Sequence, residues 1–164
     1  MTMSGDNVDG RKCKLYYLTT GTRAAWPATG GPADLDEITN VRGDLTLPLN
    51  RSEADGGDRG DEYDKVDLGR LQNEISFQLN VRKDTDSIAA IDAFLTAALA
   101  GTPMILAVLT GDKDTDGVIG VYGDYAMTKF EEKQPGNAGR RYWDVTVKPA
   151  AGYDDPEAVE VVGA

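Results

Sequence analysis

The sequence predicts a mainly β fold, an antiparallel β-sandwich or barrel with one flanking α-helix and a long inter-strand loop. Two observations lead to this prediction. Apolar residues recur with a period of two in several short segments, which is typical of half-buried strands. In one segment they recur instead at spacings of three and four, the helical pattern. The order of two strands, a long loop, a strand, a helix and three strands suits an antiparallel sheet with a helix at one end or edge.

Two strands are predicted before the long loop. Residues 14–19 are rich in β-forming residues, and residues 20–37 follow as a connection with many Gly and Pro residues. Apolar residues then alternate over residues 41–49. Because successive side chains of a strand point to opposite faces, Asp44 and Thr46 are expected on the polar face of this second strand.

Residues 50–65, NRSEADGGDRGDEYDK, show no apolar periodicity. Loops longer than about 12–15 residues are uncommon inside a domain, and most are functional or disordered. Two interpretations remain open: a surface loop without a role, and an arm that orders only against another subunit. The residues expected to act in such an arm are its charged and aromatic ones: Arg51, Glu53, Asp55, Asp58, Arg59, Asp61, Glu62, Tyr63, Asp64 and Lys65.

A third strand is predicted over residues 71–81, where the alternation is clearest. Its apolar face would hold Leu71, Ile75, Phe77, Leu79 and Val81, and its polar face Gln72, Glu74, Ser76, Gln78 and Asn80. A slip of one residue would bury the polar set, so we expect the apolar set to face the core.

The helix is predicted to begin near residues 84–86, with Asp86 as its N-cap, and to end before Gly101 and Pro103. Its apolar residues at spacings of three and four are Ile88, Ile91, Leu95, Ala98 and Leu99. Three strands complete the chain, over residues 104–110, 118–130 and 141–148.

The stretch GDKDTDG, residues 111–117, resembles the start of a calcium-binding EF-hand loop, with Asp112, Asp114 and Asp116 at ligand positions. The twelfth position of such a loop requires a bidentate Glu, and here it is Gly123. The flanking segments are predicted strands, whereas an EF-hand loop lies between helices. We therefore expect a turn between two strands, in which Asp and Gly are common, and no metal site.

Composition excludes several classes of function. The 164-residue chain has no His and one Cys, so it lacks the residues of a Ser-His-Asp triad, a Cys-His pair or the usual zinc site, and we predict no enzyme and no cofactor. Its net charge of −11 disfavours binding to nucleic acid phosphates. The longest apolar runs are far shorter than a membrane span, and the polar N-terminus carries no secretory signal. We therefore expect synthesis in the cytoplasm and no membrane insertion.

Several pieces of sequence, in this order and spacing, resemble the major tail tube proteins of long-tailed, siphovirus-like bacteriophages, which are related to the inner tube proteins of secretion systems. The pieces are KLYY at 14–17, VRGDLTL at 41–47 leading into NRSEAD at 50–55, GTPM at 101–104, AVL at 107–109, residues 112–120 and WDVTVKP at 143–149. The resemblance covers residues 12–149. It leaves residues 1–11 as an N-terminal arm and 150–164 as an acidic C-terminal tail, whose short piece over residues 158–162 is either disordered or an added edge strand in a neighbour.

The resemblance implies a structural virion protein that forms hexameric rings stacked into a tail tube for DNA delivery. Its partners would be other copies of itself, a tape-measure protein and the tail-end or terminator proteins, and DNA would pass without specific binding. The protein would be made in the cytoplasm of a bacterial host and reside in the virion tail. Candidates for the channel wall are the polar-face residues Asp44, Thr46, Glu74, Ser76 and Gln78. Two alternatives remain open: an inner tube protein of a secretion system and a calcium-binding β-domain.

Overall fold

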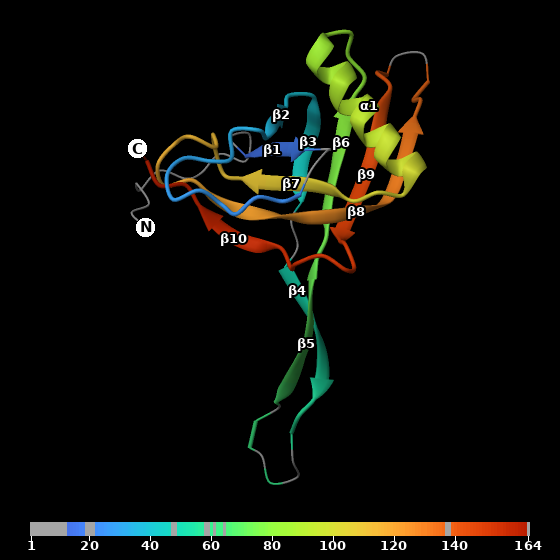
Figure 1. The fold of residues 1–164 in the computed structure, drawn as a ribbon. Helices are drawn as coiled ribbons and strands as arrows, with labels where there is room; N and C mark the ends of the chain where they lie inside the picture. The colour runs from blue at the N-terminus through green and yellow to red at the C-terminus, as the bar shows by residue number, and fades with distance from the viewer. Residues whose placement is uncertain are drawn as a thin grey trace.

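A curled antiparallel sheet with a helix packed against it forms the body of the protein, and a two-stranded hairpin projects from it (Figure 1). The computed structural model describes residues 13–18, 22–46, 49–57, 60, 62–63, 65–136 and 139–163. The predicted N-terminal arm, residues 1–11, lies outside these residues. The sheet is curled into a half-barrel, so the predicted mainly β fold with one flanking helix is confirmed for the described residues.

The elements are β1 (Lys14–Leu18), β2 (Asp36–Ile38), β3 (Val41–Thr46), β4 (Leu49–Asp55), β5 (Val66–Asn73), β6 (Ile75–Asn80), α1 (Thr85–Ala100), β7 (Met104–Leu109), β8 (Ile119–Lys133), β9 (Tyr142–Pro149) and β10 (Glu157–Glu160). The main sheet has the order β2-β1-β7-β8-β9-β6-β3, and β10 also pairs with β8. Strands β4 and β5 form a separate two-stranded sheet, the hairpin.

Strand β8 connects the two halves of the sheet because its 15 residues pair with three other strands. Its first half pairs with β7 on one edge and β10 on the other, whereas its second half pairs with β9. A bulge between Met127 and Lys129 interrupts the β8–β9 register. A bulge bends a strand and increases its twist, so it contributes to the curl of the sheet.

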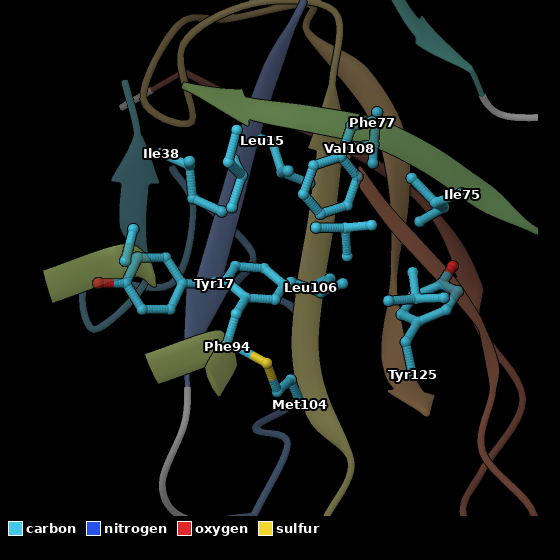
Figure 2. Packing of buried hydrophobic residues seen from close by; sticks show 14 of the residues in the cluster. Leu15, Tyr17, Ile38, Ile75, Phe77, Phe94, Met104, Leu106, Val108 and Tyr125 are labelled. Carbon is cyan, nitrogen blue, oxygen red and sulfur yellow. The ribbon is translucent and has the colours of Figure 1, made fainter. Parts of the chain in front are cut away.

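The main core lies between the curled sheet and α1 (Figure 2). Residues Ile75, Phe77 and Leu79 of β6 are buried there, which confirms the alternation predicted for this stretch. Phe94 of α1 lies at the centre, with its ring centroid 5.7 Å from that of Phe77 and 6.2 Å from that of Tyr17. Burying a Phe side chain contributes about 1.5–3 kcal/mol, so α1 is held largely through this residue.

The helix buries a different face from the one predicted. Its buried residues are Ser87, Ala90, Phe94 and Ala97, whereas Ile88, Leu95 and Leu99 are exposed. Small residues on the buried face let the helix approach the sheet closely enough for Phe94 to insert. The N-cap is Asp84, whose carboxylate accepts the Ser87 N–H at 3.1 Å, so the prediction of Asp86 was wrong.

A second core covers the opposite face of β1, β7 and the first half of β8. Its strand residues include Tyr16, Ile105, Leu109 and Tyr122. The cover comes from segments in which no periodic pattern was found: Leu35 and Trp26 of the 22–35 connection, and Val159 and Val161 near the C-terminus. Strand β7 is therefore buried on both faces. Residues 157–160 are an edge strand of the chain's own sheet rather than an irregular tail.

Arg23 fastens the 22–35 connection to the sheet. Its Nε lies 3.4 Å from the Asp124 Oδ2 atom, and both side chains are nearly buried. The same guanidinium donates hydrogen bonds to the carbonyl oxygens of Tyr122 and Asp155, at 3.3 and 3.2 Å. Burial raises the pKa of Asp124, and the positive charge of Arg23 opposes that shift. The ion pair thus joins the connection, β8 and the segment before β10.

We predict that Arg23→Gln lowers the free energy of unfolding by about 3 kcal/mol at neutral pH, because it leaves Asp124 as a buried, unpaired charge. The double variant Arg23→Gln/Asp124→Asn should recover much of this loss, since it removes the charge as well. The stability lost in the single variant should shrink as the pH falls toward the raised pKa of Asp124. In the folded state this carboxyl takes up a proton at a pH above 3.8, its ordinary pKa. Lowering the pH therefore favours the folded state.

Urea denaturation of both variants and the parent at several pH values measures these differences. Equal losses for the single and double variants, independent of pH, would contradict a stabilising role for this ion pair.

Candidate assembly surface

The hairpin β4–β5 replaces most of the predicted long loop. Residues 50–55 belong to β4, so the prediction that they lack secondary structure was wrong, and the connection between the strands begins at Gly56. Both faces of the hairpin meet solvent along most of its length, so no apolar alternation is required on β4. The hairpin extends away from the body (Figure 1), and β5 runs into β6 through the single residue Glu74.

The structure places the described arm residues on this hairpin and its connection. Arg51, Glu53 and Asp55 lie on β4, and all three are exposed. Glu62, Tyr63 and Lys65 belong to the connection, and they are exposed as well. The other four predicted arm residues, Asp58, Arg59, Asp61 and Asp64, lie outside the described residues.

The hairpin carries a row of aliphatic side chains along β5. Val66, Leu68 and Leu71 are 54, 66 and 47% exposed. They share one face because their partners on β4, Asp55, Glu53 and Arg51, are spaced by two residues. The extra residue between Leu68 and Leu71 is taken up by the register shift opposite this part of β4. We call these three residues the apolar row.

Sequence reasoning missed the apolar row. It placed Leu71 on the core face of one strand over residues 71–81, but that strand is broken at Glu74 and Leu71 lies on the exposed hairpin. The bulge hides the pattern, since a spacing of three between Leu68 and Leu71 does not suggest one face of a strand. Val81, at the other end of the predicted strand, is also exposed beyond β6. The useful signal was the presence of three aliphatic residues, Val66, Leu68 and Leu71, directly after an acidic segment.

Asn73 holds the base of the hairpin to the main core. Its Nδ2 donates to the Tyr125 hydroxyl at 3.1 Å, and both side chains are buried. Burial raises the pKa of Tyr125 to about 12, so the phenol stays neutral at physiological pH. Beside this contact, a depression of about 580 Å³ is lined by Arg51, Leu71, Asn73, Pro149, Asp155 and Pro156. The face of the hairpin with the apolar row therefore continues onto the body.

Three of the predicted channel-wall residues, Glu74, Ser76 and Gln78, lie on the polar face of β6 or directly before it. Gln78 donates to Asp144 Oδ1 at 2.8 Å, and the hydroxyls of Ser76 and Thr146 lie 3.4 Å apart. Glu74, between β5 and β6, lies 3.6 Å from Lys148 Nζ. These contacts link β6 to β9 on the side away from the main core, beside a shallow depression of about 380 Å³.

Two of the channel-wall candidates, Asp44 and Thr46, lie in β3, whose register against β6 shifts between Arg42 and Thr46. Their side chains are outside the described part of the structure. The backbone of Thr46 pairs with Ser76, so β3 and β6 are neighbours at this point.

The acidic turn at residues 111–117 uses its carboxylates in local hydrogen bonds. Asp112 Oδ1 accepts the Asp114 N–H at 2.9 Å, and this bond lowers the pKa of Asp112. Asp116 Oδ1 accepts the Gly163 N–H at 2.8 Å. Lys113 donates to the carbonyl of Leu35 at 2.7 Å, which ties the turn to the 22–35 connection. The turn therefore has a structural role in joining three segments of the chain.

The described residues contain no group of three or more His, Cys, Asp and Glu side chains placed to hold a metal ion. Within the same residues, no helix is long and apolar enough to cross a membrane.

The fold is that of proteins from phage tails and related injection machines. The chain superposes on the SPP1 tail tube with a TM-score of 0.69 and 10% identity, covering 95% of this chain and 81% of that one. For the tail of an empty gene transfer agent particle with C6 symmetry, the TM-score is 0.62 at 15% identity. The match covers 89% of this chain and 96% of that one. For a chain of the sheath-tube complex of the extracellular contractile injection system PVC, the TM-score is 0.50 at 9% identity. The match covers 96% of this chain and 94% of that one.

No family model and no curated protein matches the sequence. At these identities the comparisons establish a shared fold, and at that level they confirm the resemblance predicted from the sequence.

We predict that folding is insensitive to calcium. Replacing Asp112, Asp114 and Asp116 together with Asn should preserve the turn, because the Asn side-chain oxygen accepts the same hydrogen bonds and Asn tolerates the same turn geometry. Thermal melts of the parent and the triple variant, each with calcium and with a chelator, should show no calcium-dependent shift. A melting temperature that falls on chelation in the parent alone would instead establish a calcium site.

Proposed function

We propose that the chain is the subunit of a phage-type tail tube, in which hexameric rings stack into a channel for DNA delivery. The observation that carries the proposal is the projecting hairpin with its exposed apolar row, on a fold shared with the SPP1 tail tube. Apolar surface in water is less favourable than buried apolar surface by about 25 cal/mol per Å². A neighbouring copy that covers the row would remove this cost.

An arm that binds a different surface of the next copy gives a heterologous contact. Such contacts close into rings when the rotation between copies closes, and otherwise they continue as helical stacks. A stacked tube uses both outcomes, one within each ring and one between rings. The C6 symmetry of the gene transfer agent tail, which shares this fold, supports six copies per ring.

We assign the polar face of β6 and β3 to the channel wall, with Glu74, Ser76 and Gln78 on β6 or beside it and Asp44 and Thr46 on β3. The support is that this face is polar and cross-linked by side-chain hydrogen bonds, while the opposite face is filled by the main core. The lysines of this face are paired with carboxylates, Lys129 with Asp144 and Lys148 with Glu74, which reduces their attraction for DNA phosphates. The net charge of −11 further discourages phosphates from adhering.

In this role the protein has no enzymatic activity and needs no cofactor. Its partners are other copies of itself, a tape-measure protein that sets tail length and the proteins that cap the tail ends. It is made in the cytoplasm of the bacterial host and resides in the virion tail, where DNA passes through it without specific binding and without its insertion into a membrane.

A second candidate function is the inner tube of an injection system that delivers proteins. The observation in its favour is the shared fold with a chain of the PVC sheath-tube complex, at a lower TM-score than for the SPP1 tail tube. The two functions differ in what the tube encloses. Assembly on a tail-length tape-measure protein indicates a phage tube, and export of effector proteins indicates an injection system.

We predict that replacing residues 53–64 with a short Gly/Ser linker permits folding and prevents tube growth. The main core draws its residues from other segments, so the variant should keep the circular dichroism and melting temperature of the parent. The apolar row itself remains, but its outer part loses its partner strand because the pairs Glu53–Leu68 and Asp55–Val66 are removed, so the row is no longer presented on a hairpin. Sedimentation at concentrations where the parent forms tubes should leave the variant in the supernatant.

Tubes of normal length from this variant would contradict the role of the hairpin as an arm. A matched control is Asn50→Ser/Ala54→Ser, which changes exposed residues on the hairpin face opposite the apolar row. This control should assemble like the parent.

A further inference from the structure

We infer that an open apolar groove at one end of the half-barrel is the socket that receives the apolar row of a second copy. This assignment rests on the proposed function and specifies the surface to which the hairpin binds. The groove has a volume of about 700 Å³ and is lined mainly by apolar side chains, among them Cys13, Leu45, Val108, Ile119, Val121 and Ala158.

The groove is a continuation of the main core. Val108 belongs to that core (Figure 2), and Leu45 and Val121 pack against it. Helix α1 packs on the same core through Phe94. At the groove the walls come instead from β3, β7, β8 and β10, with Cys13 just before β1. Core surface left open in this way favours an apolar occupant, because a polar group placed there would lose its hydrogen bonds to water.

The apolar row has the chemistry that this groove requires. Val66, Leu68 and Leu71 have purely aliphatic side chains, lie on one face and are about half or more exposed. A volume of about 700 Å³ lies within the range of about 300–1,000 Å³ that takes up a drug-sized molecule, so it accommodates several such side chains. Because one chain carries both the row and the groove, their pairing joins copies head to tail.

The proposed tube supports a second copy as the occupant. The chain shares its fold with a tail of C6 symmetry, an arrangement in which copies of one chain contact each other. The chain's own residues 1–12, MTMSGDNVDGRK, are a poorer match, since Met1, Met3 and Val8 are separated by polar residues.

Cys13, the single cysteine of the chain, allows a direct test because it lines the groove. A disulfide requires Cα atoms about 4.4–6.8 Å apart, so it forms only between docked surfaces. After assembly and mild oxidation, Leu68→Cys should give a ladder of covalent oligomers on a non-reducing gel. Adding Cys13→Ser should abolish the ladder. The matched control Ala54→Cys, also exposed but on the opposite hairpin face, should give no ladder.

The unmodified chain provides a second readout. Cys13 should react readily with a maleimide in the dissociated chain and at least tenfold more slowly in tubes. Equal reactivity in the two states, or tubes of Leu68→Cys without a ladder, would overturn the groove assignment and leave the tube function standing. Protection of Cys13 already in the dissociated chain would also overturn it, because the chain's own residues would then fill the groove. A chain that remains monomeric at every concentration would overturn both proposals.

Discussion

The placement of β6 in the main core is the constraint on which the rest of the structure depends. Ile75, Phe77 and Leu79 must face the core, because a slip of one residue would bury Ser76 and Gln78 instead. The polar face of the sheet follows directly from this register. The hairpin follows as well, since β5 continues into β6 through Glu74 and is fastened by the Asn73–Tyr125 hydrogen bond. One buried strand therefore fixes the surfaces proposed for the channel wall and for assembly.

The sequence predicted most strands of the main sheet, including β7, which is buried on both faces. Alternation identified β6 and β9, and the spacing of three and four identified α1, although its buried face is the one around Phe94. Periodicity failed where burial does not alternate. Both faces of the hairpin meet solvent, and its bulge changes the spacing of Leu68 and Leu71. The 22–35 connection and residues 157–161 cover the second core with individual side chains rather than with a repeating pattern.

The hairpin also links folding to assembly. An isolated two-stranded hairpin is marginally stable in water, and this one gains support from the body at its base. In the proposed assembly, contact with another copy would bury the apolar row. A surface that costs the single chain stability would thus stabilise the assembly. The low identity to the tail proteins of similar fold fits this division, since the pattern of burial rather than particular residues specifies the body.

Electron microscopy of the purified chain in negative stain tests the central claim, that this protein is the repeating subunit of a tube, most directly. The proposed function predicts six-fold rings or hollow tubes at high protein concentration, with the polar face of β6 and β3 toward the channel once averaged images resolve the subunit. Uniform single particles of 17.6 kDa at every concentration and salt condition would contradict it.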